Sequence, residues 1–201
     1  MIDQKFNIKK VGVFFIILQL FMFFIIYQQS DYRALFWYCN HAALLFGVAF
    51  LIDNIDFVKA LINIGFLPQL FWVIDFFSKV LFNTYVFNVT DYVFNDTTYL
   101  SALVISFNHI FLIGVALYTT YKYKTSNKSV WYSFMYIMIL FIITMLFTNP
   151  IDNANCVQYF CAYPLITGLF YRVLWPILAF SLMVLPTYYI QHLLYKWSQK
   201  P

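Results

Sequence analysis

Two side chains of this sequence, the thiol of Cys39 and the imidazole of His109, are of the types that carry out nucleophilic catalysis. A cysteine attacks as the thiolate, and a neighbouring base must hold the thiol in that form. His41 is closer in sequence, but successive helical residues turn by about 100°, so its side chain points nearly opposite to that of Cys39. We therefore predict that any catalytic pair joins Cys39 to His109 on a separate helix.

Acidic and amide side chains would supply the remaining parts of such a site. Asp75 or Asp91 would orient the imidazole, and the amide of Asn40 or Asn155 would donate to an oxyanion. We predict catalytic roles for Cys39, His109 and Asp75. The candidate substrate-binding residues are Asn40, His41, Gln69, Asp91, Asn153, Asn155 and Arg172.

Each of these residues also has a structural interpretation. A buried cysteine such as Cys39 usually packs as a small apolar group, and His109 can bond a carbonyl or a tyrosine hydroxyl. Asp75 and Arg172 can form an ion pair that joins two helices. The residue types alone therefore leave a catalytic site and a set of helix contacts both open.

Composition places these side chains in a membrane. Hydrophobic residues make up 63% of the chain and charged residues only 10%, whereas soluble domains carry about 25% charged residues. We predict an all-α fold, a polytopic transmembrane bundle of about six helices in one domain over residues 1–201. The helices are expected at about 11–28, 35–52, 57–77, 99–120, 131–148 and 165–195. Pro176 and Pro186 predict kinks in the last helix.

Loop charge predicts the orientation. Nine of the 12 Lys and Arg residues fall in the N-terminal segment, the turn at Lys59, the 120–130 loop and the C-terminal segment, all on one side of the bundle. By the positive-inside rule both termini are cytoplasmic. We expect a multi-pass protein of the plasma membrane or an organellar inner membrane.

The same topology places the polar residues at similar depths, in the outer half of the bundle, while the inner halves of the helices read as almost purely apolar. Polar side chains are costly in lipid and normally face the bundle interior. A polar pocket open to the outer side is the simplest prediction. This distribution argues against a through-pathway, since a transporter needs polar lining on both sides of the midplane.

Few other motifs suggest chemistry. Cys156 and Cys161 would form a small disulfide in an oxidising compartment, with a free pair as the alternative. Three histidines without an acidic cluster do not predict a metal site, and no nucleotide-binding or haem-attachment motif predicts a cofactor. We expect membrane lipids as partners, with subunits of a membrane complex as an alternative, and no nucleic acid.

Short motifs in a fixed order carry a resemblance. They are Trp37-Tyr-Cys-Asn40, Pro68-Gln-Leu-Phe-Trp-Val-Ile-Asp75, Ser106-Phe-Asn-His109 and Asn153-Ala-Asn155. This order resembles a family of uncharacterised bacterial integral membrane proteins and, more distantly, the YwaF-like membrane proteins. Eukaryotic relatives of the latter include an acyltransferase that uses a membrane-embedded cysteine to move acyl chains between phospholipids. The resemblance implies that Cys39 is the nucleophile and His109 its partner, although Asn108 stands where a bulky apolar residue is expected.

Two classes of function follow. The first is a lipid acyltransferase or hydrolase that uses Cys39 and His109 in a pocket open to the outer leaflet. The second is a protein without catalysis, which would bind or transport a small solute or serve as a structural subunit of a membrane complex. A quinone- or haem-binding role ranks third, since His41 and His109 are the only conceivable ligand pair across helices.

Overall fold

The fold is an all-α bundle, as predicted. The computed structural model describes residues 2–29, 32–95, 98–151, 153–161 and 166–200. The helices are α1 (Ile2–Gln29), α2 (Tyr38–Leu51), α3 (Ile55–Phe82), α4 (Asp91–Asn95), α5 (Tyr99–Thr120), α6 (Asn127–Phe147), α7 (Leu169–Ala179) and α8 (Leu185–Ser198). Short helical turns are η1 (Tyr32–Phe36), η2 (Ala154–Cys156) and η3 (Phe180–Val184).

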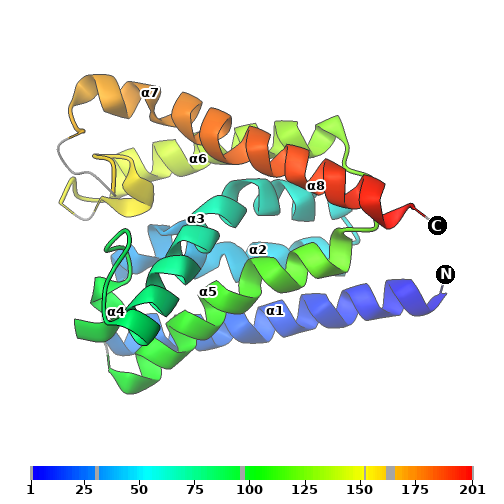
Figure 1. The fold of residues 1–201 in the computed structure, drawn as a ribbon, viewed down its shortest axis with the longest axis horizontal. Helices are drawn as coiled ribbons and strands as arrows, with labels where there is room; N and C mark the ends of the chain where they lie inside the picture. Colours follow the sequence, from blue (N-terminus) through cyan, green and yellow to red (C-terminus); the bar gives the residue numbers. More distant parts are fainter. Residues whose placement is uncertain (1, 30–31, 96–97, 152, 162–165, 201) are drawn as a thin grey trace.

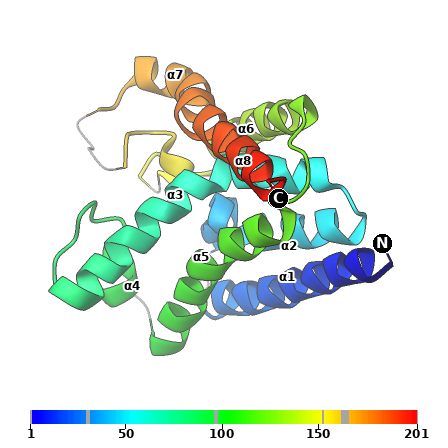
Figure 2. The same cartoon turned by 45° about the vertical axis from the view of Figure 1, so that its right-hand side comes forward.

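Helix α3 is the centre of the bundle. Figure 1 shows α6, α7 and α8 on one side of it and α1, α2 and α5 on the other, and the turned view in Figure 2 agrees. The principal packing partners of α3 are α6, α5 and α2, while α1 packs chiefly on α2. Residues that face each other across α3 therefore come from segments far apart in the sequence.

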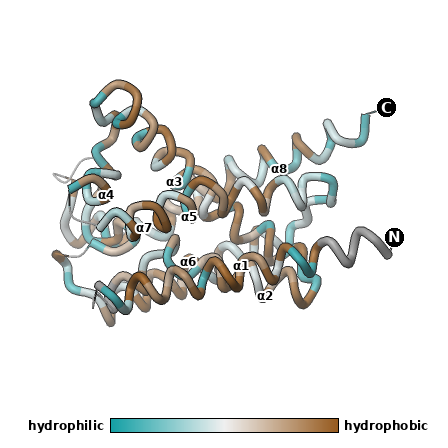
Figure 3. Tube along the Cα trace, turned by 90° about the horizontal axis from the view of Figure 1, so that it is seen from below, coloured by the Kyte–Doolittle hydropathy of each residue, from teal (hydrophilic) through white to brown (hydrophobic). Residues whose placement is uncertain are grey.

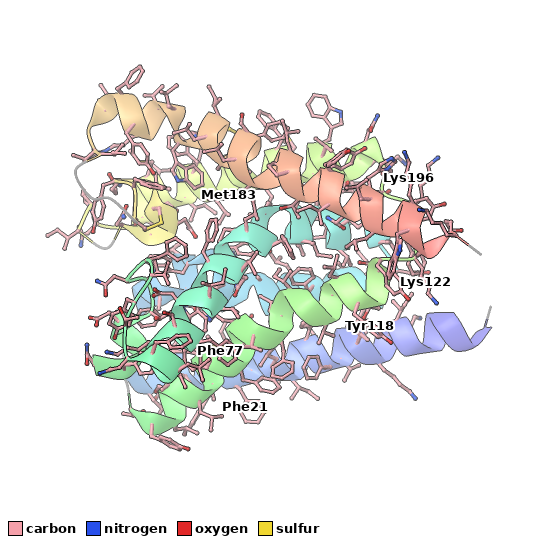
Figure 4. The ribbon with its side chains drawn as sticks, viewed as in Figure 1. Phe21, Phe77, Tyr118, Lys122, Met183 and Lys196 are labelled. Carbon is pink, nitrogen blue, oxygen red and sulfur yellow. A yellow bond between two sulfur atoms is a disulfide. The ribbon has the colours of Figure 1, made fainter. Side chains whose placement is uncertain are left out.

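The helices are apolar on the outside as well as inside. Five of them are long and apolar enough to cross a membrane, and α7, η3 and α8 count together as one, Leu169–Ser198. Figure 3 shows hydrophobic residues along the helices and hydrophilic ones mainly toward the two ends. Large aromatic side chains such as Phe21 and Tyr118 point outward in Figure 4, with 57% and 78% of their surface exposed. An outer surface of this kind belongs in lipid.

The two chain ends lie together at one end of the bundle (Figure 1). Lys122 and Lys196 lie at the same end (Figure 4). The positive-inside rule predicts that this end faces the cytoplasm. We call it the inner end and the opposite end, with the loops on either side of α4, the outer end.

Helix α2 is shorter than the predicted span 35–52. It contains 14 residues, which correspond to about 21 Å, less than the ~30 Å hydrocarbon core. The chain reaches it through the η1 turn and an extended residue, Trp37. Near its start, the Asn40 carbonyl accepts a hydrogen bond from Gln19 in the central part of α1 (2.7 Å). The first turn of α2 thus lies inside the bundle and not at the outer surface.

Proline residues shape two other helices. Helix α3 continues through Pro68 to Phe82, five residues beyond the predicted end at 77, and stops where Asn83 adopts the left-handed conformation (φ 53°). Before Pro186 the last helix widens into the π turn η3. A proline has no N–H for the preceding turn, and a wider turn accommodates the loss. Helix α5 has the predicted bounds, 99–120.

Candidate functional site

Asp75 is the most strongly hydrogen-bonded side chain at the outer end. It is fully buried, and its carboxylate accepts bonds from the backbone N–H groups of five consecutive residues, Val86 to Thr90, at 2.7–3.1 Å. A sixth bond comes from the Thr90 hydroxyl (2.9 Å). Successive amides that surround an anion in this way form a stable binding concavity. The carboxylate therefore folds the outer loop onto α3.

These contacts of Asp75 hold the loop 86–90 against α3, while its predicted catalytic role stays a prediction. Its hydrogen bonds in the described chain all go to the loop 86–90, and none reaches His109 or Arg172. Asp91, the second candidate for orienting the imidazole, accepts from Asn95 within α4 (2.7 Å). Neither acidic residue is in place to orient His109.

Two asparagines organise the loop between α6 and α7. Asn153 bonds the backbone N–H groups of Gln158 and Tyr159 and the Tyr159 carbonyl (2.9–3.0 Å). Cys156 and Cys161 form a disulfide across the same loop. We call residues 153–161 the disulfide loop.

Asn155 connects the disulfide loop to the interrupted start of α2. Its Oδ1 accepts from the N–H of Tyr38 (2.8 Å), and its Nδ2 donates to the carbonyl of Phe36 (2.7 Å) and the hydroxyl of Thr144 (3.2 Å). A break in a helix leaves backbone groups unpaired, and in apolar surroundings another protein group must satisfy them. One side chain supplies both bonds across this break.

Asn40 and His41 also make structural contacts. Asn40 donates to the carbonyl of Ala34 (2.8 Å). The Nδ1–H of His41 donates to the carbonyl of Leu35 (2.8 Å), since a carbonyl can only accept, and its Nε2 pairs with the hydroxyl of Tyr136. Both ring nitrogens of His41 are therefore used in holding η1 and α6 against α2.

A second group of polar side chains lies between α2, α3, α4 and α5. Asn108 donates to the backbone carbonyl of Cys39 (2.8 Å), and the ring of His109 stacks on Trp72 with centroids 4.2 Å apart. The Trp72 Nε1–H donates to the hydroxyl of Tyr92 (3.2 Å). We call this group, with Gln69 one turn before Trp72, the outer polar cluster. Its members are Cys39, Gln69, Trp72, Tyr92, Asn108 and His109.

The cluster contains both members of the predicted catalytic pair, Cys39 and His109, but each forms its hydrogen bond with another group. The Cys39 thiol is half-buried and its hydrogen bond goes to the Oδ1 of Asn40 (3.6 Å). The Nδ1–H of His109 donates to the carbonyl of Ile105 in its own helix (2.9 Å). When the ring is neutral, this bond leaves its Nε2 as the acceptor nitrogen. No hydrogen bond between thiol and imidazole occurs in the part of the chain that the structure describes, so the catalytic pair stays a prediction.

Two acceptors of the outer polar cluster lack donors. The Oε1 of Gln69 and the Oδ1 of Asn108 are buried, and among the described residues neither has a hydrogen-bond partner. Gln69 is 5% exposed and Asn108 is fully buried. An unpaired buried acceptor costs about 1–3 kcal/mol. The Nε2 of a neutral His109 is a third atom of the cluster that can accept a hydrogen bond.

Arg172 lies apart from this cluster. It is in the second turn of α7, half-buried, and its Nε has no partner among the described residues. Helix α7 packs against α6 on the far side of α3 (Figure 2). The predicted substrate-binding set is thus divided between the disulfide loop, the start of α2, α4 (Asp91), α7 and the outer polar cluster, which contains Gln69.

The prediction that the inner half of the bundle is almost purely apolar is wrong. Gln191 of α8 donates to the carbonyl of Lys59 (3.0 Å) and to the Oδ1 of Asn63 (2.7 Å), and Asn63 donates to Ser133 of α6 (3.2 Å). Lys59 is fully buried, and its ammonium donates to Thr125 (3.1 Å). Single polar residues within apolar runs, such as Asn63, were a usable sequence signal for this inner polar network.

The inner end also carries an open surface depression of about 500 Å³. The turn before α3 and the loop after α5 line it, including Asp53, Asp56, Tyr123 and Lys124. Asp56 accepts from Ser126 (2.6 Å). Burial, together with the charge of Asp53, raises the pKa of Tyr123. Polar groups therefore lie in both halves of the bundle, which removes the argument from distribution against a solute pathway.

Fold and site define a class of protein, an all-α integral membrane protein with buried polar groups in both halves of its bundle. Comparisons with protein-family models, with curated proteins and with solved structures give no match for this chain.

Proposed function

We propose that this chain is a lipid-binding membrane protein, and that its outer polar cluster receives the amine or hydroxyl donors of a lipid head group. The observation that carries the proposal is the pair of buried oxygens on Gln69 and Asn108, neither of which has a donor among the residues that the structure describes. Buried polar atoms in folded proteins seldom lack a hydrogen-bond partner, because each unpaired atom costs about 1–3 kcal/mol of stability. The Nε2 of His109 adds a third acceptor, and no cation stands among the six members of the cluster.

The surroundings of the cluster favour a ligand that is part polar and part apolar. Tyr92 is 37% exposed, so the cluster reaches the protein surface near the outer end. The buried residues Trp72, Val93 and Ile105 form an apolar group beside it, with Met22 of α1. A phosphatidylethanolamine head group, with three N–H donors on its amine and acyl chains in the bilayer, has the required chemistry.

The test compares two lipids that differ in their donors. Purified protein is exposed to equal amounts of phosphatidylethanolamine and phosphatidylcholine, whose quaternary amine has no N–H, and retained lipid is counted by native mass spectrometry. We expect roughly tenfold preference for phosphatidylethanolamine, the equivalent of about one hydrogen bond, and its loss in Gln69→Met. Gln158→Met is the matched control, since Gln158 has an unpaired Oε1 in the disulfide loop.

Equal retention of both lipids by the wild-type protein would refute the proposal. Preference for phosphatidylcholine would also refute it, since quaternary amines bind the aromatic faces of Trp72 and Tyr92 and need no acceptor.

A second candidate function is acyl transfer through Cys39, in line with the proposed relationship to the YwaF-like proteins. One observation favours it: Asn108 anchors the Cys39 backbone in the first turn of α2, next to His109 with its free Nε2. Helix N-termini are positions at which reactive thiols occur. Cys39→Ala should then abolish lipid deacylation and leave lipid retention unchanged. An active Cys39→Ala variant would exclude this mechanism.

A further inference from the structure

The disulfide loop and the first turn of α2 are held together by one side chain. Asn155 pairs with the N–H of Tyr38 and the carbonyl of Phe36, on either side of the helix break. Cys39 follows directly, and its backbone carbonyl is bound by Asn108. Any movement of Asn155 therefore acts on the turn that carries Cys39.

The backbone conformation that presents Asn155 is unfavourable by itself. Asn153, Asn155 and Cys156 all have positive φ angles, of 42°, 55° and 58°. The left-handed region is uncommon for residues other than glycine, with asparagine the more tolerant of the two types here. Cys156 in particular needs external support to stay in it.

Three contacts supply that support. The disulfide ties Cys156 to Cys161, the Tyr171 hydroxyl donates to the Cys156 carbonyl (2.8 Å), and the Trp175 Nε1–H donates to the Asn155 carbonyl (3.1 Å). The last two are hydrogen bonds from α7 and do not respond to a reductant. Of the three contacts, only the disulfide depends on redox conditions. Loss of this covalent tie leaves the strained backbone held by hydrogen bonds alone, among them the bond from the Cys156 N–H to the Asn153 carbonyl (2.9 Å).

We infer that the Cys156–Cys161 disulfide is a redox-controlled latch on the start of α2, with Asn155 as its positioning residue. A thiol reductant breaks the S–S bond, gives two electrons and two protons to form two thiols, and is itself oxidised to a disulfide. Cys156 then relaxes from the left-handed conformation, Asn155 leaves Phe36 and Tyr38, and the first turn of α2 opens. Opening exposes Cys39, the remaining free thiol of the oxidised chain.

The test measures alkylation of Cys39 by N-ethylmaleimide, read by peptide mass spectrometry on full-length protein in lipid nanodiscs. Wild-type protein is compared before and after dithiothreitol, alongside Cys156→Ser/Cys161→Ser and Asn155→Ala. We expect the rate at Cys39 to rise roughly tenfold in all three, the effect of about one lost hydrogen bond. In Asn155→Ala, dithiothreitol should add nothing further. Asn127→Ala, at the inner end, is the control and should match the wild type.

Two results would overturn the latch. One is an unchanged alkylation rate at Cys39 after complete reduction. The other is a rise in Cys39 alkylation accompanied by an equal loss of hydrogen-exchange protection in the core of α5, around Leu112. That result would mean that the disulfide stabilises the whole fold and not the start of α2 in particular. The readout is thiol exposure and not lipid retention, so the latch and the proposed lipid binding can fail independently.

Discussion

The substitution Gln69→Met tests whether the outer polar cluster is incomplete without a ligand. Gln69 is 5% exposed and its Oε1 has no donor among the described residues. Methionine has nearly the same volume and helix propensity, so packing and backbone terms change by less than about 1.5 kcal/mol. Removal of the unpaired oxygen contributes about 1–3 kcal/mol in favour of the variant.

The expected balance is a more stable protein. In delipidated detergent solution Gln69→Met should unfold at a free energy higher by roughly 1 kcal/mol, which corresponds to about 2–4 °C in the melting temperature for a chain of this size. The assay is thermal or denaturant unfolding followed by tryptophan fluorescence. After phosphatidylethanolamine is added, the wild type should gain stability and the variant should not.

Gln191→Met makes the same chemical replacement, but it should change the free energy of unfolding in the opposite direction. Gln191 also has an unpaired Oε1, but its Nε2 donates to Lys59 and Asn63. Loss of two buried bonds should lower stability by about 2 kcal/mol. If Gln69→Met destabilises the delipidated protein by as much as Gln191→Met, the unpaired oxygen is not the dominant effect and the reasoning fails.

Three further substitutions test the structural account by the same unfolding measurement. Asp75→Asn should cost roughly 3 kcal/mol, because an amide group cannot accept all the bonds that the loop 86–90 donates to the carboxylate, and a loss below about 1 kcal/mol would contradict this. Gly65→Ala should cost about 1–3 kcal/mol, since the new Cβ would lie 2.6 Å from the Tyr38 ring; an unchanged midpoint would show that Tyr38 moves freely. Lys59→Met should be neutral or stabilising by about 1 kcal/mol, as a buried ammonium with one side-chain bond is replaced by an apolar chain, and strong destabilisation would reveal a further partner of Lys59.

The sequence contained the information for the long spans and for the common side of the two chain ends. Hydropathy over 18 or more residues is a local property, and the predicted bounds of α5 match the observed ones. Counting the lysines on each side likewise requires only the order of the spans along the chain. Both chain ends lie at the lysine-rich end, as this count predicted (Figures 1 and 4). These predictions needed no knowledge of packing.

The contacts of the candidate residues could not be predicted in this way. Asn155 completes a helix break 117 residues earlier in the chain, and Gln191 bonds a carbonyl 132 residues away. Five of the six hydrogen bonds to Asp75 come from backbone N–H groups, which every residue type except proline provides. Depth in the membrane put Cys39 and His109 in one layer, but which atoms meet depends on helix rotation, which depth does not determine.

The most direct test of the lipid-binding proposal is an experimental structure in a phosphatidylethanolamine bilayer. The account predicts non-protein density whose donor atoms lie about 2.7–3.2 Å from the Gln69 Oε1 and the Asn108 Oδ1. Density for water alone at both oxygens, or protein donors turned onto them, would contradict it.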